Sequence, residues 1–300
     1  LPLFHVFAMT TVMTFGIASG MELILMPKFE MGQTLKLIGT LRPTVMPGVP
    51  TLFQALLHHR NIESFDLSSL QFCISGGAAL PMDVKRGFEK LIGGSLVEGY
   101  GLSETSPVAT CNPFRSFKDS SIGLPLPGTE IAIRSLENPA QEMPIGEPGE
   151  ICIAGPQVMS GYWNKPDETA AAFVGSYFRT GDVGYMDPDG FIFIVDRIKD
   201  MINSAGFKVY PRRIEDALYE HPAVAECCVV GIPDPYRGEA PKAYVRLHED
   251  SPASAVDLMN FLRPKLSKLE LPTAIELRDE LPKTMIGKLS KKALRAETPG

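Results

Sequence analysis

The residues best suited to chemistry in this sequence begin with one lysine near its end. The stretch "LPKTMIGKLSKKAL" places Lys288 directly behind Gly287, in a frame of proline and threonine. A lysine-rich end is usually a solvated surface, which is what we expect of Lys283, Lys291 and Lys292. Gly287 lets the backbone lie close to a partner surface, and a flexible ammonium can act as a point charge on phosphate oxygens. Lys288 is therefore the candidate for catalysis.

A second candidate stretch, "EGYGLSET", places two carboxylates, an aromatic ring and a hydroxyl at the end of an expected strand. Glu104 stands beside Ser103, and Mg²⁺ prefers one or two carboxylates together with phosphate oxygens. The stretch "SGGAAL" also follows an expected strand, and its two glycines, Gly76 and Gly77, permit close approach of a flat or anionic ligand. A tight turn between strand and helix explains those glycines equally well.

The third stretch with chemical potential is "YFRTGDVGYMDPDGFIFIVDRIKD". Asp182 follows Thr-Gly, where its carboxylate can accept two hydrogen bonds, as from ribose hydroxyls. Arg197 and Lys199 alternate with an apolar residue and share one face of a strand end. A solvated basic edge that deters strand pairing is the alternative explanation for them.

Composition excludes several classes of protein. Apolar residues make up 44% and charged residues 21%, which indicates a globular chain. The net charge of −6, without a basic stripe, argues against nucleic acid as a partner. The five cysteines form no CxxC and no metal spacing with histidine, so we expect buried thiols in a reducing, cytoplasmic setting.

Strands and helices must alternate to position these residues. Helices are expected over residues 32–41, 51–59 and 81–92, and strands over 43–49, 70–77 and 95–101. This alternation predicts an α/β fold with a parallel sheet, and ligands of such sheets sit beyond the carboxyl ends of the strands. Both "SGGAAL" and "EGYGLSET" fall at that end.

The later sequence changes character twice. Residues 121–136, 146–156 and 184–197 read as short antiparallel strands punctuated by Gly and Pro, and "DPDG" ending at Gly190 is a turn signal. Helices over 211–221 and 254–266 and strands over 223–232 and 242–247 follow. We therefore expect a large αβ domain over residues 1–120, a barrel-like β subdomain over 121–196 and a mobile α+β domain over 197–300, with a hinge near 197–200.

One uncharged segment, residues 6–21, requires a membrane test. It is shorter than the roughly 20 apolar residues that a spanning helix needs. We expect a buried helix that leads into a strand, "ELILMP", over residues 22–27. Nothing in the segment resembles a signal peptide.

Taken together, the motifs resemble those of the adenylate-forming superfamily, and within it the acyl-CoA synthetases. The matching motifs, in order, are "LPLFHVFA", "SGGAAL", "YGLSET", "FRTGD", "DRIKDMINSAGFKVYPRRIE" and "LPKTMIGK". The resemblance covers essentially the whole chain, and the runs "TGDVGYMDPDGFIFIVDRIKDMI" and "GFKVYP" are most like bacterial long- or medium-chain fatty acid–CoA ligases. It implies a fatty acid, ATP and coenzyme A as substrates, with Mg²⁺ as cofactor.

The resemblance also implies roles for individual residues. The adenine-binding set comprises Gly76, Gly77, Ala78, Glu98, Gly99 and Tyr100. Ser103 would contact phosphate, Glu104 would ligate Mg²⁺, and Asp182 with Arg197 would hold the ribose. His5 would lie beside the carboxylate substrate. Lys288 would reach the phosphates and the carboxylate, Lys199 would lie at the hinge, and Gly206 with Phe207 would flank the pantetheine of coenzyme A.

Departures from the family pattern concern both half-reactions. Relatives often carry Gln in place of Glu98, some carry a second lysine where this chain has Asn203, and some carry Gln in place of Lys208. The family's Ser/Thr/Gly-rich phosphate loop does not occur in these 300 residues, so we expect the sequence to be a fragment without measurable adenylation of its own.

Four matters stay open at this point. An aryl-CoA ligase and an adenylation domain that loads a carrier protein are alternatives within the family, and a non-catalytic nucleotide- or partner-binding remnant is the alternative outside it. Peripheral contact with the inner face of a membrane and formation of a homodimer are compatible with the sequence, which decides neither. The acyl chain length is equally open.

Overall fold

The computed structural model describes residues 1–249, 251–284 and 289–297, which form two compact units. Unit 1 comprises Leu1–Thr180 and Gly184–Ile194, and unit 2 comprises Gly181–Val183 and Val195 onward. Strand β9 (Tyr177–Met186) runs through both units. The expected division into three parts with a hinge near residues 197–200 remains a prediction.

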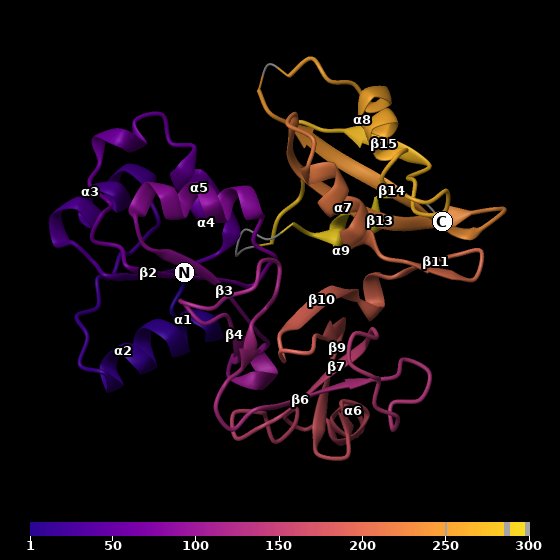
Figure 1. Ribbon diagram of the computed structural model, residues 1–300, viewed down its shortest axis with the longest axis horizontal. Helices are drawn as coiled ribbons and strands as arrows, with labels where there is room; N and C mark the ends of the chain where they lie inside the picture. Colours follow the sequence, from indigo (N-terminus) through magenta and orange to yellow (C-terminus); the bar gives the residue numbers. More distant parts are fainter. Residues whose placement is uncertain (250, 285–288, 298–300) are drawn as a thin grey trace. The chain divides into compact units, whose positions relative to one another are not determined.

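The first sheet of unit 1 has the order β1-β2-β3-β4-β5 (Figure 1). Strands β1 (Val45–Gly48), β2 (Phe72–Gly76) and β3 (Ser95–Gly101) are parallel. Strands β4 (Val108–Cys111) and β5 (Leu124–Pro125) continue the sheet in antiparallel pairing. The predicted α/β fold with a parallel sheet is confirmed by this order and pairing.

Three helices cover one face of this sheet: α3 (Met31–Leu41), α4 (Pro50–Leu57) and α5 (Met82–Ile92). Their apolar faces and the strands share one core, which includes Leu35, Phe53, Phe88, Cys73 and Leu96. Helix α5 ends where Gly93 adopts φ of +69°, a conformation that glycine takes without strain. A short 3₁₀ helix, η2 (Ile62–Ser64), connects α4 to β2.

The expectation for residues 6–27 was partly wrong. The segment is helical through α1 (Val6–Ala8), the π-helix η1 (Met9–Thr14) and α2 (Phe15–Ala18), but Phe15 and Ile17 are 56% and 67% exposed. Residues 22–27 form no strand, because no described strand pairs with them. A local apolar run predicts a strand only when a partner supplies the ladder hydrogen bonds.

The second sheet of unit 1 has the order β10-β9-β7-β6, with β8 beside β9. Its other strands are β6 (Glu130–Arg134), β7 (Gly149–Ala154), β8 (Phe173–Val174) and β10 (Ile192–Arg197), and helix α6 (Pro166–Ala171) precedes β8. The predicted turn at Gly190 is present: its amide donates to the Asp187 carbonyl over 3.0 Å, and its φ is +85°. The sheet shares a core with β4 around Ile122, Ile151 and Ile192.

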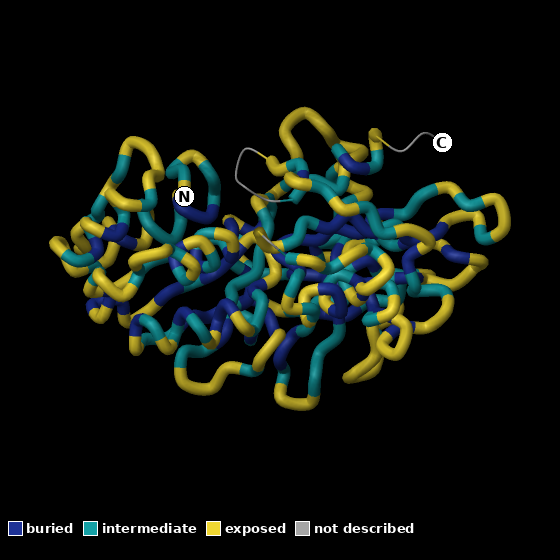
Figure 2. The backbone as a smooth tube through the Cα atoms, turned by 90° about the horizontal axis from the view of Figure 1, so that it is seen from above, coloured by how far each residue is buried: buried dark blue, intermediate teal, exposed yellow. Residues whose placement is uncertain are grey.

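Unit 2 contains the third sheet, of order β12-β11-β14-β13, with β15 parallel to β14. After η4 (Ile198–Asp200), its elements are β11 (Ile202–Ser204), β12 (Phe207–Val209), α7 (Pro211–Tyr219), β13 (Val224–Asp234), β14 (Gly238–Leu247), α8 (Ala255–Leu262), β15 (Ala274–Leu277) and α9 (Lys291–Ala296). Strands β13 and β14 are mostly buried, whereas β12 and β15 are more exposed. Figure 2 shows how burial varies along the backbone. Within the described residues, no helix combines the length and apolarity that crossing a bilayer requires.

Candidate active site

The parallel register of unit 1 brings two of the sequence motifs side by side. Ser75 of β2 pairs with Glu98 of β3, and Gly76 pairs with Gly99. "SGGAAL" and "EGYGLSET" therefore leave the sheet at the same carboxyl edge, where α/β sheets bind ligands. Gly77 is exposed there and adopts φ of +85°, which turns the chain away from the strand. Ala78 is exposed beside it.

The N-terminal motif reaches the same edge. A Cβ atom added to Gly76 would lie 3.0 Å from the Phe7 ring, so the ring packs directly on that glycine. The Thr10 hydroxyl donates to the Ser106 carbonyl over 3.1 Å, which joins this helix to the turn that follows β3. His5 precedes α1, and its Nδ1 accepts from the Phe7 amide at 3.2 Å. Three motifs that are far apart in sequence thus meet at one place.

Glu104 lies on the single turn η3 (Ser103–Thr105), which a buried hydroxyl holds in place. The Thr105 Oγ1 accepts from the Leu102 amide at 2.9 Å and donates to the Pro107 carbonyl at 2.5 Å. Ser103 is exposed at the start of this turn, and Glu104 is half-buried. The turn is short and anchored, so it can present both side chains to a ligand.

Glu104 supplies one carboxylate, so a magnesium ion bound there needs further oxygen ligands from a nucleotide and from water. Among the described residues, no group of three or more His, Cys, Asp or Glu side chains is arranged to hold a metal. Mg²⁺ is commonly held by one or two carboxylates with substrate phosphates and water completing its shell. The single carboxylate of Glu104 suits a cation that arrives with a nucleotide and is unsuited to a permanent protein site.

Sequence reasoning missed a neighbour of this carboxylate. The Tyr162 hydroxyl donates to Glu104 Oε1 over 3.0 Å, although the two residues lie 58 positions apart. The only sequence signal for this residue is its position in the glycine-led turn "SGYWN" that precedes α6.

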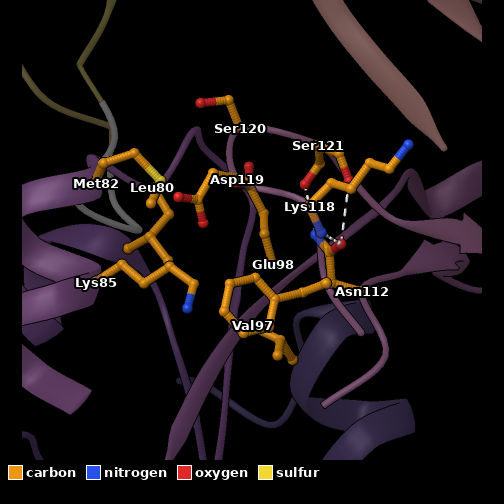
Figure 3. A pocket seen from close by; sticks show the side chains of 11 residues that line it. Leu80, Met82, Lys85, Val97, Glu98, Asn112, Lys118, Asp119, Ser120 and Ser121 are labelled. Atoms are coloured by element: carbon orange, nitrogen blue, oxygen red, sulfur yellow. Dashed lines mark hydrogen bonds between the residues drawn. The ribbon is translucent and has the colours of Figure 1, made fainter. Parts of the chain in front are cut away.

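A small pocket lies beside Glu98, between β3 and the start of α5 (Figure 3). Most of its other polar groups are paired: Lys85 with Glu89 at 2.6 Å, and Asn112 with the Ser121 carbonyl at 2.5 Å. Its lining consists of Leu80, Met82, Lys85, Val97, Glu98, Asn112, Phe117, Lys118, Asp119, Ser120 and Ser121. Because Leu80 ends "SGGAAL" and Glu98 begins "EGYGLSET", the pocket borders both motifs.

Tyr100, two residues after Glu98, is half-buried against the core around Ile192.

In unit 2, a buried carboxylate and an exposed guanidinium form a second group. Asp182 on β9 is 2% exposed, and its Oδ1 lies 3.0 Å from Nε of Arg197, whose side chain is 51% exposed. The arginine follows directly on Asp196, which accepts hydrogen bonds from the backbone amides of Arg197 at 2.7 Å and Arg212 at 2.8 Å. Burial raises the pKa of Asp196. Lys199 is exposed on η4.

The hairpin between β11 and β12 carries the residues expected near coenzyme A. Ser204 pairs with Phe207, and the two linking residues Ala205 and Gly206 both have positive φ, of 53° and 83°. This is the backbone pattern of a type I′ hairpin turn. A Cβ atom added to Gly206 would have no atom within 4 Å, and Phe207 is 64% exposed. The tip of the hairpin is therefore open.

Lys288 lies outside the described residues, but its flanks are described. Lys283 and Leu289 form an isolated bridge, and the Ser290 amide donates to the Pro282 carbonyl over 2.8 Å. Residues 282–283 and 289–290, on the two sides of residues 285–288, are therefore held together by backbone hydrogen bonding. Leu289 then leads directly into α9, whose Leu294 is fully buried.

The expectation that Lys291 faces solvent was wrong. Its Nζ lies 3.0 Å from Glu215 Oε1 on α7, and the two side chains are only 21% and 16% exposed. Burial would lower the pKa of Lys291, but the charges of Glu215 and Asp196 outweigh it and raise that pKa. Lys283 is 40% exposed and pairs with Glu226 at 2.6 Å. Lys292 is exposed, as expected.

The cysteines are mostly buried thiols, as the sequence predicted. All five are free thiols; four are buried, and Cys111 is half-buried. Burial raises the pKa of Cys73 and of Cys228 to about 12, which leaves them protonated and unreactive at neutral pH.

The chain is similar to known proteins in both sequence and structure. The family model described as "AMP-binding enzyme" matches residues 1–163, and the model described as "AMP-binding enzyme C-terminal domain" matches residues 213–288. A long-chain-fatty-acid–CoA ligase of Bacillus subtilis is 50% identical over 99% of this chain and 53% of its own length. A feruloyl-CoA synthase of an Amycolatopsis species is 38% identical over 98% of this chain and 60% of its own length.

A solved structure has a similar fold. ATP-bound MatB from Rhodopseudomonas palustris superimposes with a TM-score of 0.93 at 31% identity, covering 99% of this chain and 58% of that one. The chain spans about half the length of the curated relatives it matches.

Proposed function

The chain belongs to the AMP-binding enzyme family, and we propose on that basis that it forms part of an ATP-dependent acid–CoA ligase. In the first half-reaction, the substrate carboxylate attacks the α-phosphate of ATP, giving an acyl-adenylate and pyrophosphate. In the second, the thiol of coenzyme A attacks the acyl carbon, AMP leaves, and the thiol proton is lost to solvent. Neither step needs a covalent enzyme nucleophile, so catalysis rests on positioning and on neutralising phosphate charge.

The observation that carries this proposal is the meeting of three motifs at the carboxyl edge of β2 and β3. Phe7 packs on Gly76, the Thr10 hydroxyl bonds to the turn after β3, and Gly76 pairs with Gly99. In the proposed role, the adenine lies against Gly76, Gly77, Ala78, Glu98, Gly99 and Tyr100. His5 stands on the same helical segment as Phe7, where it would border the carboxylate substrate.

Glu104 and Ser103 would serve the phosphates. Glu104 would hold Mg²⁺ through its carboxylate, and Ser103 would donate a hydrogen bond to a phosphate oxygen. The bound cation would supply positive charge that neutralises the triphosphate. The position of both residues on one anchored turn supports this assignment.

We assign the remaining roles to residues of unit 2. The buried Asp182 can accept hydrogen bonds from both ribose hydroxyls, and Arg197 holds its carboxylate in place at 3.0 Å. Lys288 would contact the phosphates and the attacking carboxylate. Lys199 would lie at the hinge, and the hairpin tip at Gly206 and Phe207 would flank the pantetheine arm.

We propose a long- or medium-chain fatty acid as the substrate. The support is the similarity to the Bacillus subtilis relative, whose name states that acid class, and identity to it is higher than to the feruloyl-CoA synthase. An aryl acid is the second candidate, because the latter relative is named for one. A cytoplasmic location, contact with the inner face of a membrane and a homodimer complete the proposal as untested predictions.

The test uses a chimera in which this chain replaces the matching segment of the Bacillus subtilis relative. Purified chimera is given ATP, Mg²⁺, coenzyme A and, in turn, fatty acids of graded length, ferulate and benzoate, and acyl-CoA is measured by mass spectrometry. We expect the highest kcat/KM with a fatty acid. A preference for ferulate would replace the substrate class, and transfer to a carrier protein in preference to coenzyme A would contradict the ligase assignment.

A further inference from the structure

The loop between β7 and α6 contacts Glu104 at two points. The Met159 amide donates to the Glu104 carbonyl over 2.8 Å, and the Tyr162 hydroxyl donates to Glu104 Oε1 over 3.0 Å. One contact fixes the backbone of the turn and the other fixes the side chain. Glu104 is therefore held at both ends by a loop that no sequence motif connected to it.

Tyr162 is itself anchored to α6. Its amide donates to the Thr169 hydroxyl over 2.9 Å, and that hydroxyl donates to the Lys165 carbonyl over 2.7 Å. The preceding Gly161 has φ of +152°, and an added Cβ would lie 2.7 Å from the Thr169 methyl group. Only glycine fits there, so the backbone that carries the phenol is fixed by packing and by hydrogen bonds.

A phenol is a suitable partner for a carboxylate that must stay charged. It donates one hydrogen bond and brings no charge, so it restrains the carboxylate without competing for a cation. With Oε1 occupied, the other carboxylate oxygen remains to meet a metal ion.

We propose that Tyr162 is a positioning residue for Glu104: its hydroxyl fixes the carboxylate in the orientation that accepts nucleotide-bound Mg²⁺. The inference rests on the proposed function, since it requires Glu104 to be the metal ligand. Groups that orient a metal ligand through a hydrogen bond typically change metal affinity 10- to 100-fold when they are removed. Tyr162 touches neither the metal nor the nucleotide in this role.

The chain offers a matched control. The Tyr177 hydroxyl donates to Glu130 Oε2 over 2.9 Å, the same pairing at a carboxylate with no proposed role. Both Tyr162→Phe and Tyr177→Phe remove one phenolic oxygen and preserve the ring. The Tm and the circular dichroism of each variant report whether the fold is kept.

The experiment measures Mn²⁺ binding to the chimera by electron paramagnetic resonance, with and without α,β-methylene-ATP. With the analogue present, we expect Tyr162→Phe to weaken Mn²⁺ binding about ten-fold and Tyr177→Phe to leave it unchanged, at equal Tm. In pyrophosphate exchange, the Mg²⁺ concentration for half-maximal rate should rise by the same factor, with little change in kcat at saturating Mg²⁺. On a Glu104→Gln background, Tyr162→Phe should have no further effect on Mn²⁺ binding.

Three results would overturn the inference, and they are distinguishable. Equal Mn²⁺ affinity in wild type and Tyr162→Phe would remove the positioning role while leaving the proposed function intact. Absence of analogue-dependent Mn²⁺ binding in the wild-type chimera would contradict the proposed function, and the inference would fall with it. A loss of affinity in Tyr162→Phe that persists on the Glu104→Gln background would show that the tyrosine acts elsewhere.

Discussion

Replacing Lys291 by methionine should destabilise unit 2 and leave unit 1 unchanged. The Lys291 ammonium is 3.0 Å from Glu215 Oε1, which also accepts the Val229 amide at 2.8 Å. The pair joins α9 to α7 and to β13. Methionine preserves most of the aliphatic stem, so the substitution removes the charge and little of the packing.

The magnitude follows from the burial of the pair. Removing one partner of a fully buried ion pair costs about 3–5 kcal/mol, because the other charge is left without compensation. Here the side chains are 21% and 16% exposed, so some water reaches both groups. We therefore expect a loss of about 2–3 kcal/mol, which corresponds to a rise of roughly 30- to 150-fold in the opened population at 1.36 kcal/mol per decade.

The loss should depend on pH. Burial raises the pKa of Glu215, so the folded state holds its proton more tightly than the unfolded state. Such a group contributes full stability below its ordinary pKa, and that contribution is lost as pH rises through the folded value. Without Lys291 the folded pKa of Glu215 rises further, so the deficit should be larger at pH 8 than at pH 5.

Amide hydrogen exchange of peptides from β13 provides the assay, corrected for intrinsic exchange at each pH. Lys292→Met is the control, because Lys292 is exposed and neighbours Lys291 on the same helix. Adding Glu215→Gln to Lys291→Met should restore part of the protection by removing the uncompensated charge. Equal protection in the Lys291 and Lys292 variants, or a larger deficit at pH 5, would refute the reasoning.

Three further predictions concern the active site and its scaffold. Lys288→Ala in the chimera should slow adenylation roughly 10²–10³-fold and spare thioester formation from preformed acyl-adenylate; equal losses in both steps would contradict the assignment. Asp182→Asn should weaken AMP binding by about ten-fold or more in calorimetry, on the scale of a hydrogen bond to a charged group, and unchanged affinity would exclude ribose binding. Gly101→Ala should lower the urea concentration at which unit 1 unfolds, read from hydrogen exchange of peptides from β3, because its Cβ would lie 1.6 Å from the Pro107 carbonyl oxygen; Gly39→Ala, with only one atom nearby at 3.8 Å, is its control and should be neutral or stabilising.

The local sequence pattern was sufficient to predict the helices and strands of unit 1 that carry the motifs. The apolar spacing of residues 81–92, with Pro at the start, predicted α5 within one residue. The sequence "SLVEGYG" coincides with β3. Parallel pairing of the strands then places Gly76 beside Gly99, which the alternation of strands and helices implied but could not specify residue by residue.

Contacts between distant segments were beyond sequence reasoning. Lys291 belongs to a lysine-rich run, and nothing local shows that Glu215 lies 3.0 Å away within unit 2. Tyr162 was missed for the same reason, because its partner Glu104 is 58 positions distant. The failed strand over residues 22–27 has the opposite cause, since its apolar pattern was present but no strand among the described residues pairs with it.

The claim on which the other predictions depend is that this chain forms part of an adenylate-forming enzyme. Exchange of ³²P-labelled pyrophosphate into ATP by the chimera, with and without palmitate, tests that claim most directly because it isolates the first half-reaction. We expect exchange that depends on both palmitate and Mg²⁺ and falls to background when Glu104→Gln and Lys288→Ala are combined. Exchange that is independent of any added carboxylic acid, or that survives the double substitution, would contradict it.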